Sequence, residues 1–589
     1  MDPHSFYQNN VQEHAAIVKK LKARLRVLSV LRLTVFLIMA AIPYFLWGNV
    51  PVISIGIAIG LAIFLLLVSK YSDLKHTANY HKQLIAINEV ELKVIDGDLS
   101  GLKTGEEYIY ENHHFNQDID LFGQGSIFQI INRTEIKKGE QLLANWLNSN
   151  SIDNIADKQK SIHELNEKAK WRQHYKASAA LIKTEVSSSV IIKWIKNYTA
   201  FVPNAFKAIP IIFSVLSIGV MTLYAIDIIS WIELFLWLVV GLIITGPYVK
   251  RITKLYNASH QMKETFAQYA QLLSAVESES FESEVLKEQQ ERIKTEGVKA
   301  SLILKSISKQ IDYLGNRNNM IFAPLMNGFF LWDLFFAYRI EQWMNNFDSA
   351  INDWFDVIEY FDAANSLGNL AFNKPSYIYP EISEKSSDQI TAKGLGHPLL
   401  NTKAMVTNDI NINNEDFFII TGANMAGKST FLRTVAVNLV MANCGLPVCA
   451  EEFSYRPIKL ISSMRTSDSL TNDESYFFSE LKRLKFIVES IETDTYFIIL
   501  DEILKGTNSK DKAEGSQKFV ERLVASNSTG LIATHDLSLC QLSDKLPEIQ
   551  NHYFDAEIVD DELFFDYTFK EGICQNMNAS FLLKKMNIV

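Results

Sequence analysis

A short apolar run followed by a glycine-rich segment constrains the fold of this chain more than any other feature. The run Phe417–Ile420 has the character of a buried strand, and after it come Gly422 and then Gly427-Lys428-Ser429. An apolar segment of helical length follows. Glycines let backbone amides turn toward a polyphosphate, and the helix N-terminus adds partial positive charge. This order of strand, loop and helix therefore predicts an α/β domain with a phosphate-binding loop.

The polar residues of this loop are suited to holding a nucleotide. Lys428 supplies a full positive charge for the outer phosphates, and Ser429 supplies a hydroxyl for Mg²⁺. A chance glycine-rich turn is the alternative, and the complete pattern in this context makes it the weaker one. The residues expected to contact the nucleotide are Gly422, Ala423, Asn424, Met425, Ala426, Gly427, Lys428, Ser429 and Thr430.

Two further strand ends carry residues suited to ATP hydrolysis. The apolar strand Tyr496–Leu500 ends in Asp501 and Glu502, and the short strand Leu531–Ala533 ends just before His535. One carboxylate at a strand tip can hold the water shell of Mg²⁺, and the next can polarise the attacking water. Asp501 is therefore predicted on the metal side and Glu502 as the general base. His535 can hydrogen-bond the γ-phosphate or the attacking water, although such a histidine alone is more often structural.

A hydroxyl-rich segment precedes the helix between these strands. Ser475 lies at the start of that helix, where a small hydroxyl is most simply an N-cap. The same hydroxyl could instead donate to a phosphate, including one bound by a second subunit.

Four apolar runs outside this domain form two pairs. Leu33–Trp47 and Val52–Val68 make the first pair, and Ala208–Ile226 and Trp231–Ile244 make the second. Each run approaches the length that spans a bilayer, so each pair is predicted to be a transmembrane hairpin. A buried hairpin in a water-soluble core is the alternative for the first pair.

Basic residues place the outer ends of these hairpins in the cytoplasm. A basic flank, Lys19–Arg26, precedes the first run, and Lys70 and Lys250 follow the two pairs. An even number of spans returns the chain to the side that it left. We therefore expect a multi-pass protein of the cell membrane, with the nucleotide site in the cytoplasm.

Composition restricts the partners of the chain. Its net charge is −10 over 589 residues, so any contact with nucleic acid needs a local basic patch. The four cysteines form no CxxC pair, which argues against a zinc site or a disulfide framework.

The chain thus divides into five expected segments. Apolar residues at helical spacing dominate the regions between the hairpins and the α/β domain, so these regions are predicted to be all-α. The segments are the basic N-terminus with the first hairpin (1–70), a helical part (71–200), the second hairpin (201–250), a second helical part (251–385) and the α/β domain (386–589).

Together these motifs resemble the MutS family of DNA mismatch-repair ATPases, within the wider ABC-type ATPases. TGANMAGKSTFLR is similar to the MutS phosphate loop, with Ala423 and Ala426 in place of the usual Pro and Gly. LDEILKGTNSKD is similar to the Asp-Glu stretch of the family, and ATHD has His535 at its switch histidine. ESYFFSEL resembles a signature-like loop, in which Ser475 would reach the nucleotide of the opposing subunit. The resemblance also implies that Tyr567 lies near the adenine.

The resemblance extends upstream more weakly. Asp120–Asn148 resembles the start of the MutS lever region, and Glu359–Phe372 resembles its return segment. In the family these stretches bracket a helical excursion that ends in a DNA clamp, whereas here the excursion contains the second apolar pair. We find no N-terminal mismatch-reading domain, and no Phe-x-Glu wedge where such a domain would lie.

The resemblance implies a membrane-anchored ATPase that uses ATP and Mg²⁺, acts as a homodimer and binds double-stranded DNA in repair. The alternative is an ABC-type mechanical or transport protein with no DNA role. The candidates for a DNA-facing surface are Lys137, Lys138, Lys168, Lys170 and Arg172, although such a run is more often a solvated helical face.

Overall fold

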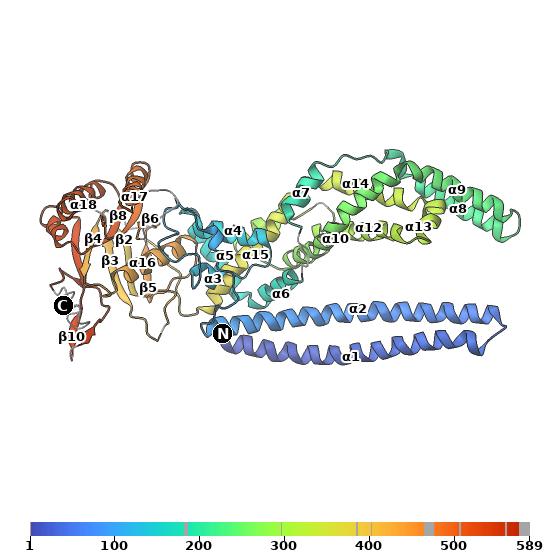
Figure 1. Cartoon of the computed structure of the whole chain (residues 1–589), viewed down its shortest axis with the longest axis horizontal. Helices are drawn as coiled ribbons and strands as arrows, with labels where there is room; N and C mark the ends of the chain where they lie inside the picture. Colours follow the sequence, from blue (N-terminus) through green and yellow to red (C-terminus); the bar gives the residue numbers. More distant parts are fainter. Residues whose placement is uncertain are drawn as a thin grey trace.

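The computed structural model has an α/β domain at one end of an elongated molecule, a helical region beside it and two helical arms beyond (Figure 1). The helical N-terminal region and the C-terminal α/β domain that the sequence predicts are thereby confirmed. The structure describes residues 2–181, 186–295, 297–383, 387–401, 403–464, 476–505, 508–559 and 562–575.

The first arm, which we name the lower arm after its place in Figure 1, is a pair of long antiparallel helices. They are α1 (Pro3–Phe45) and α2 (Val50–Ile95). The helices approach closely where Gly60 faces Met39, since a Cβ on Gly60 would lie 2.4 Å from Met39 Cγ. The far end of the arm leaves its apolar side chains uncovered, and Trp47 is 89% exposed.

The second arm, the upper arm of Figure 1, contains several shorter helices. Its far end is an apolar hairpin of α8 and α9, and α13 packs on α9 where Gly241 meets Gly328. A Cβ on Gly241 would lie 2.1 Å from the carbonyl oxygen of Gly328, so only glycine permits this contact. The helices are α7 (Ser188–Lys196), α8 (Ile209–Ala225), α9 (Trp231–Thr245), α10 (Val249–Ser278), α12 (Ala300–Gly315), α13 (Phe322–Phe330) and α14 (Trp332–Phe347).

Three helical stretches of the described residues have the length and apolar character needed to cross a membrane. They are Pro3–Phe45, Val50–Ile95 and Trp231–Ser278, and the apolar helix Ile209–Ala225 is shorter. The apolar stretches of the first two are entirely uncovered by the rest of the chain. Both apolar pairs are therefore helical hairpins, and their location in a membrane stays a prediction.

The helical region next to the α/β domain is organised around α15, most of whose side chains are buried. Helices α4, α5 and α6 pack on it. The helices of this region are α3 (Ile127–Ile131), α4 (Lys137–Asn148), α5 (Ile155–Glu167), α6 (Ala169–Ala180), α11 (Glu284–Arg292) and α15 (Ala350–Asn373).

A buried polar network ties the base of the lower arm to this region. Glu91 of α2 accepts hydrogen bonds from Arg133 Nε at 2.6 Å and from Asn373 Nδ2 at 2.8 Å. Tyr7 of α1 donates to Asn373 Oδ1 at 2.7 Å. Removing one member of a buried ion pair such as Glu91–Arg133 typically costs about 3–5 kcal/mol, so this short attachment holds the arm firmly.

The α/β domain contains a six-stranded sheet and a four-stranded sheet. The larger sheet has the order β12-β9-β4-β8-β7-β6, in which only the edge strand β12 is antiparallel to its neighbour. Its strands are β4 (Phe417–Gly422), β6 (Lys459–Ser463), β7 (Tyr496–Asp501), β8 (Thr529–Ala533), β9 (Ile549–Phe554) and β12 (Lys570–Glu571). The strands predicted before the glycine loop, before Asp501 and before His535 are thus confirmed.

The smaller sheet has the order β1-β5-β2-β3, and a hairpin of β10 and β11 lies outside both sheets. Its strands are β1 (Glu381–Ile382), β2 (Asp388–Leu395), β3 (Asn408–Asn413) and β5 (Glu452–Tyr455), and those of the hairpin are β10 (Glu557–Val559) and β11 (Glu562–Phe564). The helices of the domain are α16 (Lys428–Asn443), α17 (Tyr476–Ile491) and α18 (Ser509–Val524).

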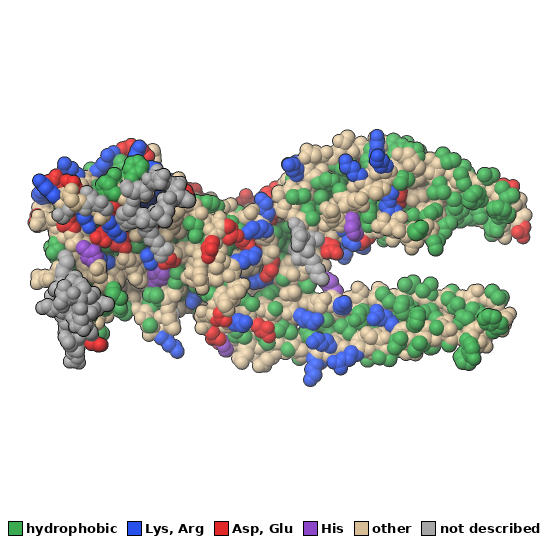
Figure 2. Space-filling model, in the orientation of Figure 1, with side chains coloured by type: hydrophobic (Ala, Val, Ile, Leu, Met, Phe, Trp, Pro, Cys, Tyr) green, Lys and Arg blue, Asp and Glu red, His purple; other side chains and the backbone are tan. Residues whose placement is uncertain are grey.

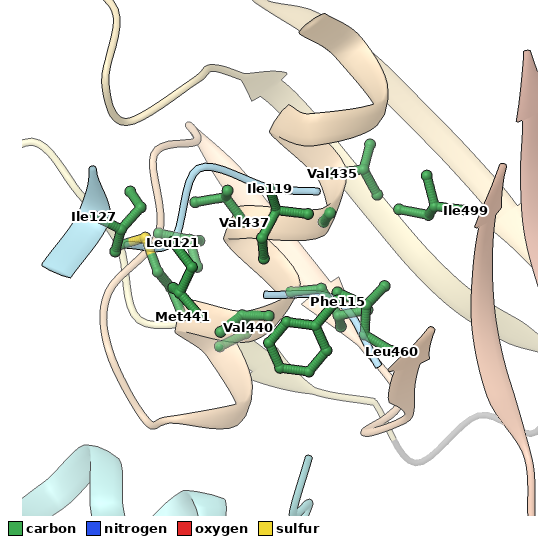
Figure 3. Packing of buried hydrophobic residues seen from close by; sticks show 14 of the residues in the cluster. Phe115, Ile119, Leu121, Ile127, Val435, Val437, Val440, Met441, Leu460 and Ile499 are labelled. Carbon is green, nitrogen blue, oxygen red and sulfur yellow. The ribbon is translucent and has the colours of Figure 1, made fainter. Parts of the chain in front are cut away.

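A turn-rich segment of the helical region lies directly on the α/β domain. Figure 3 shows Phe115, Ile119 and Leu121 against Val440 and Met441 of α16, the helix that follows the glycine loop. These side chains belong to one buried hydrophobic cluster. A displacement of α16 would therefore be transmitted directly to the helical region, because no linker lies between them.

Candidate functional site

A cavity of about 520 Å³ opens at the carboxyl ends of β4, β7 and β8. Ligands of open parallel sheets bind at this edge, because the loops that follow the strands converge there. The residues predicted from the sequence that line the cavity are Ala423, Asn424, Met425, Ala426, Gly427, Lys428, Ser429, Thr430, Asp501, Glu502, His535 and Tyr567.

The glycine loop that forms the floor of the cavity depends on unusual backbone conformations. Gly422 and Gly427 have φ values of 149° and 104°, and Met425 has a φ of 68°. A Cβ at Gly422 would lie 2.5 Å from the carbonyl oxygen of Phe554, so a larger residue would force the strands apart. Non-glycine residues held at positive φ concentrate at functional sites, which fits the place of Met425.

Lys428 is turned back into the loop. Its Nζ donates to the carbonyl oxygens of Gly422 at 2.7 Å and Ala423 at 2.9 Å. Burial lowers the pKa of Lys428, and the charges of Asp501 and Glu502 only partly oppose this. A phosphate in the loop would give this ammonium a stronger partner than two neutral carbonyl groups.

Glu502 is held by its backbone and by two lysines. Its N–H donates to the carbonyl oxygen of Ala533 at 2.8 Å, and its φ is 56°. Lys512 Nζ lies 3.1 Å from one carboxylate oxygen, and Lys505 Nζ lies 3.6 Å from the other. Burial raises the pKa of Glu502, but the hydrogen bond and charge of Lys512, together with Lys505, outweigh it and lower the pKa overall. The carboxylate is therefore ionised at neutral pH.

His535 lies on the same side of the cavity as the two carboxylates. Burial lowers its pKa, and the charge of Lys428 lowers it further, against the opposing effect of Glu502 and Asp501. The imidazole is therefore neutral at neutral pH and can donate one hydrogen bond and accept another.

The opposite wall is apolar and aromatic, as an adenine site would be. Tyr567 has a φ of 54°, and its carbonyl oxygen accepts a hydrogen bond from Asn408 Nδ2 at 3.0 Å. Its ring lies over the loop, where Cδ1 would be 3.1 Å from a Cβ on Gly427. The rest of this wall comprises Leu395, His397, Leu400, Ala404, Val406, Asn408 and Phe554, none of which is among the residues that the sequence was expected to place on the nucleotide.

The residues present fit a magnesium ion held with the nucleotide rather than by protein alone. Within the described ranges, no group of three or more His, Cys, Asp or Glu side chains could hold a metal. Ser429 and Asp501 both line the cavity, and Mg²⁺ commonly takes one or two protein ligands together with phosphate oxygens and water. Ser475 lies outside the described residues.

The fold and the cavity define the class of this domain: an α/β domain with a glycine-rich loop, a lysine and two strand-end carboxylates around one pocket. The family model described as MutS domain V matches residues 418–584. Residues 418–584 are therefore similar to a domain of the MutS family.

Known relatives match about a third of the chain. MutS protein homolog 4 of Homo sapiens is 29% identical over 234 residues, which cover 38% of this chain and 24% of the relative. The DNA mismatch repair protein MutS of Thermotoga maritima is 32% identical over 203 residues, or 33% of this chain and 25% of the relative. The DNA mismatch repair protein MutS of Syntrophomonas wolfei is 34% identical over 203 residues, which cover 33% of this chain and 23% of the relative. The chain thus spans about a quarter of the length of these relatives.

Proposed function

We propose that this chain is a membrane-anchored ATPase of the MutS family, which binds and hydrolyses ATP with Mg²⁺ as a homodimer at the cytoplasmic face of the cell membrane. The observation that supports this most is the convergence of Lys428, Asp501, Glu502 and His535 on one cavity above the glycine loop. These residues come from three strand ends, so a chance arrangement would not bring them together.

Each of these side chains has a separate task in the proposed reaction. Lys428 leaves the carbonyl groups of the loop and meets the outer phosphates. The Ser429 hydroxyl, together with Asp501 acting through water, would hold Mg²⁺, which would supply neutralising charge for the phosphates. Glu502 accepts a proton from the attacking water, and neutral His535 donates a hydrogen bond at the γ-phosphate. Ser475 of the second subunit would complete the site.

Two substitutions separate nucleotide binding from hydrolysis. Lys428→Ala should abolish both tight ATP binding and turnover, because the outer phosphates lose their cation. Glu502→Ala should bind ATP but lose at least about 100-fold in turnover, since only the base is removed. Full-length protein in detergent would be assayed for phosphate release and for retained ATP. Unchanged hydrolysis by purified Glu502→Ala protein would refute the assignment.

The two arms support the membrane part of the proposal. Their far ends expose many apolar side chains, which is costly in water and favourable in lipid (Figure 2). The α16 helix touches the helical region through Phe115–Leu121, so motion at the nucleotide has a packed route toward the arms. A protein that remains in the supernatant after membranes are pelleted would contradict the anchoring.

A DNA role is the second candidate, and the names of the relatives favour it. Three of the five candidate basic residues are paired with acidic side chains or buried within the chain. Lys137 pairs with Glu140 at 2.8 Å, Lys168 pairs with Glu279 at 2.7 Å, and Arg172 is buried. Salt-sensitive binding of double-stranded DNA by the solubilised full chain, with and without ATP, would support this role. The absence of binding at low salt would leave an ATP-driven mechanical or transport protein.

A further inference from the structure

The base of the apolar part of the lower arm carries an uncompensated positive band. We define the lower band as the exposed side chains Lys19, Lys20, Lys22, Arg24, Arg26 and Lys70. Residues 15–72 contain no Asp or Glu at all. Within the described part of the chain, none of the six side chains has an acidic partner within 4.0 Å. The charge of the band is therefore available to an external partner.

The distance from this band to the tip of the arm matches the thickness of a membrane. About 29 Å of helix separates Arg26 from Phe45, and a similar length separates Lys70 from Pro51. The hydrocarbon core of a bilayer is about 30 Å thick. When the tip reaches the far side of that core, the band therefore lies at the headgroups of the near leaflet.

The upper arm repeats this arrangement. We define the upper band as the exposed side chains of Lys207, Lys250, Arg251 and Lys254. Between residues 186 and 263 the only acids are Asp227 and Glu233, both at the far end. About 28 Å of helix separates Lys250 from Trp231 at that end.

The acids on neighbouring helices of the upper arm do not neutralise its band. Asp312 pairs with Lys263 at 2.6 Å, and buried Asp333 lies 3.4 Å from Arg317. Both arms extend from the same side of the helical region, and blue side chains gather on each of them behind its green end (Figure 2). One membrane plane therefore suits both bands.

We propose that the lower and upper bands together bind the anionic phospholipid headgroups of the cytoplasmic leaflet, so that the chain selects negatively charged lipid as its boundary. The inference rests on the proposed membrane anchoring. Lysine and arginine next to an anionic leaflet gain favourable electrostatic energy that adds up over clustered charges. Nucleic acid is the weaker partner, because burial of the apolar tips brings the bands against lipid headgroups and leaves no room for a duplex.

The test measures lipid selectivity at the protein surface. Full-length protein would be reconstituted into phosphatidylcholine membranes that contain spin-labelled phosphatidylglycerol or spin-labelled phosphatidylcholine. The motionally restricted fraction of each label gives the preference. The band variant carries Lys19→Gln, Lys20→Gln, Lys22→Gln and Arg24→Gln. Its matched control carries Lys403→Gln, Lys510→Gln, Lys518→Gln and Lys545→Gln, four exposed lysines of the α/β domain.

We expect wild-type and control protein to prefer phosphatidylglycerol, and the band variant to lose at least about threefold of that preference. Added salt should weaken the preference of the wild type. Equal restriction of both lipids by the wild type, or undiminished preference in the band variant, would overturn the inference while leaving the anchoring intact. No restricted lipid in any sample would instead overturn the anchoring itself. Loss of DNA binding in the band variant, with lipid preference unchanged, would assign the band to nucleic acid and overturn the inference.

Discussion

Lys512 is the nearest cation to Glu502, and it comes from α18 rather than from the strand end that carries the two carboxylates. Lys512 lies in the first turn of α18, ten residues after Glu502, and its Nζ is 3.1 Å from a Glu502 carboxylate oxygen. The general base of the proposed reaction is thereby kept ionised, although Lys512 and the attacking water then compete for the same oxygen.

Replacing Lys512 by Met should shift the pH dependence of turnover. Since Lys512 lowers the pKa of Glu502, its loss raises that pKa, and the base becomes protonated at a higher pH. The acidic limb of the turnover profile should then move to higher pH, while turnover at about pH 8 changes little. The measurement is the pH profile of kcat in full-length protein.

Lys510→Met is the matched control, because Lys510 lies in the same turn but is exposed and forms no ion pair with Glu502 in the described structure. Its profile should overlay that of the wild type. If both variants behave alike, the contact between Lys512 and Glu502 has no part in the reaction.

At this scale the sequence predicts the residues of contiguous motifs and misses those that the fold brings in from elsewhere. Gly427, Lys428 and Glu502 are predictable because a loop or a strand end fixes them relative to their neighbours. His397 and Asn408 are not, because their place in the cavity depends on how the smaller sheet packs against the larger one. The pairing of Lys512 with Glu502 likewise depends on where α18 packs in the folded domain.

Among the elements, α17 is joined to the helical region by Arg483, in addition to the ring contact between Phe486 and His114. Arg483 donates to the carbonyl oxygens of His113 at 2.7 Å, His114 at 2.6 Å and Ser462 at 2.9 Å. The first two belong to the segment that packs on α16, and the third belongs to β6. Arg483 thus holds three elements of two regions together with one planar group.

Arg483→Ala should leave these carbonyl groups without their charged donor and destabilise the junction by about 2–3 kcal/mol. We expect a lower Tm for the full chain in detergent and faster proteolysis between the helical region and the α/β domain. Lys485→Ala on the same helix removes only an exposed pair with Glu489 and should cost less than about 1 kcal/mol. Equal Tm values for the two variants would show that the hydrogen bonds of Arg483 do not stabilise this junction.

The buried carboxylate of Asp362 on α15 makes the helical region sensitive to pH. It accepts the N–H of Ile136 at 2.9 Å at the start of α4. Burial raises its pKa from 3.8 to about 7. Between these values the folded chain keeps a proton that the unfolded chain has released. Stability therefore falls as pH rises through this window, by at most about 1.4 kcal/mol per pH unit.

Asp362→Asn removes this ionisation, so the Tm of the variant should change less than that of the wild type between about pH 5 and pH 8. Asp356→Asn, which alters an exposed carboxylate of the same helix, should retain the wild-type dependence. Parallel curves for Asp362→Asn and wild type would show that this carboxyl group does not titrate as proposed.

For the whole molecule, the two hairpins predict a definite pattern of exposure across a membrane. Asn49→Cys and Ile228→Cys, at exposed positions of the two tips, should react with an impermeant maleimide added to intact cells. Ser72→Cys and Lys254→Cys should react only after permeabilisation. All four native cysteines are buried, so the background is low. Labelling of all four engineered sites in intact cells, or of none, would contradict the proposed topology.

The division of the chain is largely readable from its sequence, because apolar runs and the change from helical to strand periodicity are local signals. The relation between the two arms is not. Residues 71–200 separate the two hairpins along the chain, and α6 packs against both α2 of the lower arm and α10 of the upper arm. Neither contact leaves a pattern in any one segment.

The two arms stand apart over their length, and the lower one is joined to the rest only near its base. With both tips in one bilayer, fluid acyl chains would fill the interval between them. If one arm moved relative to the other, it would have to displace lipid. The stiffness and viscosity of the surrounding bilayer would then affect the rate of each ATP cycle. Turnover in ordered, sterol-like or saturated films should consequently be slower than in fluid ones, even though the nucleotide pocket never touches them.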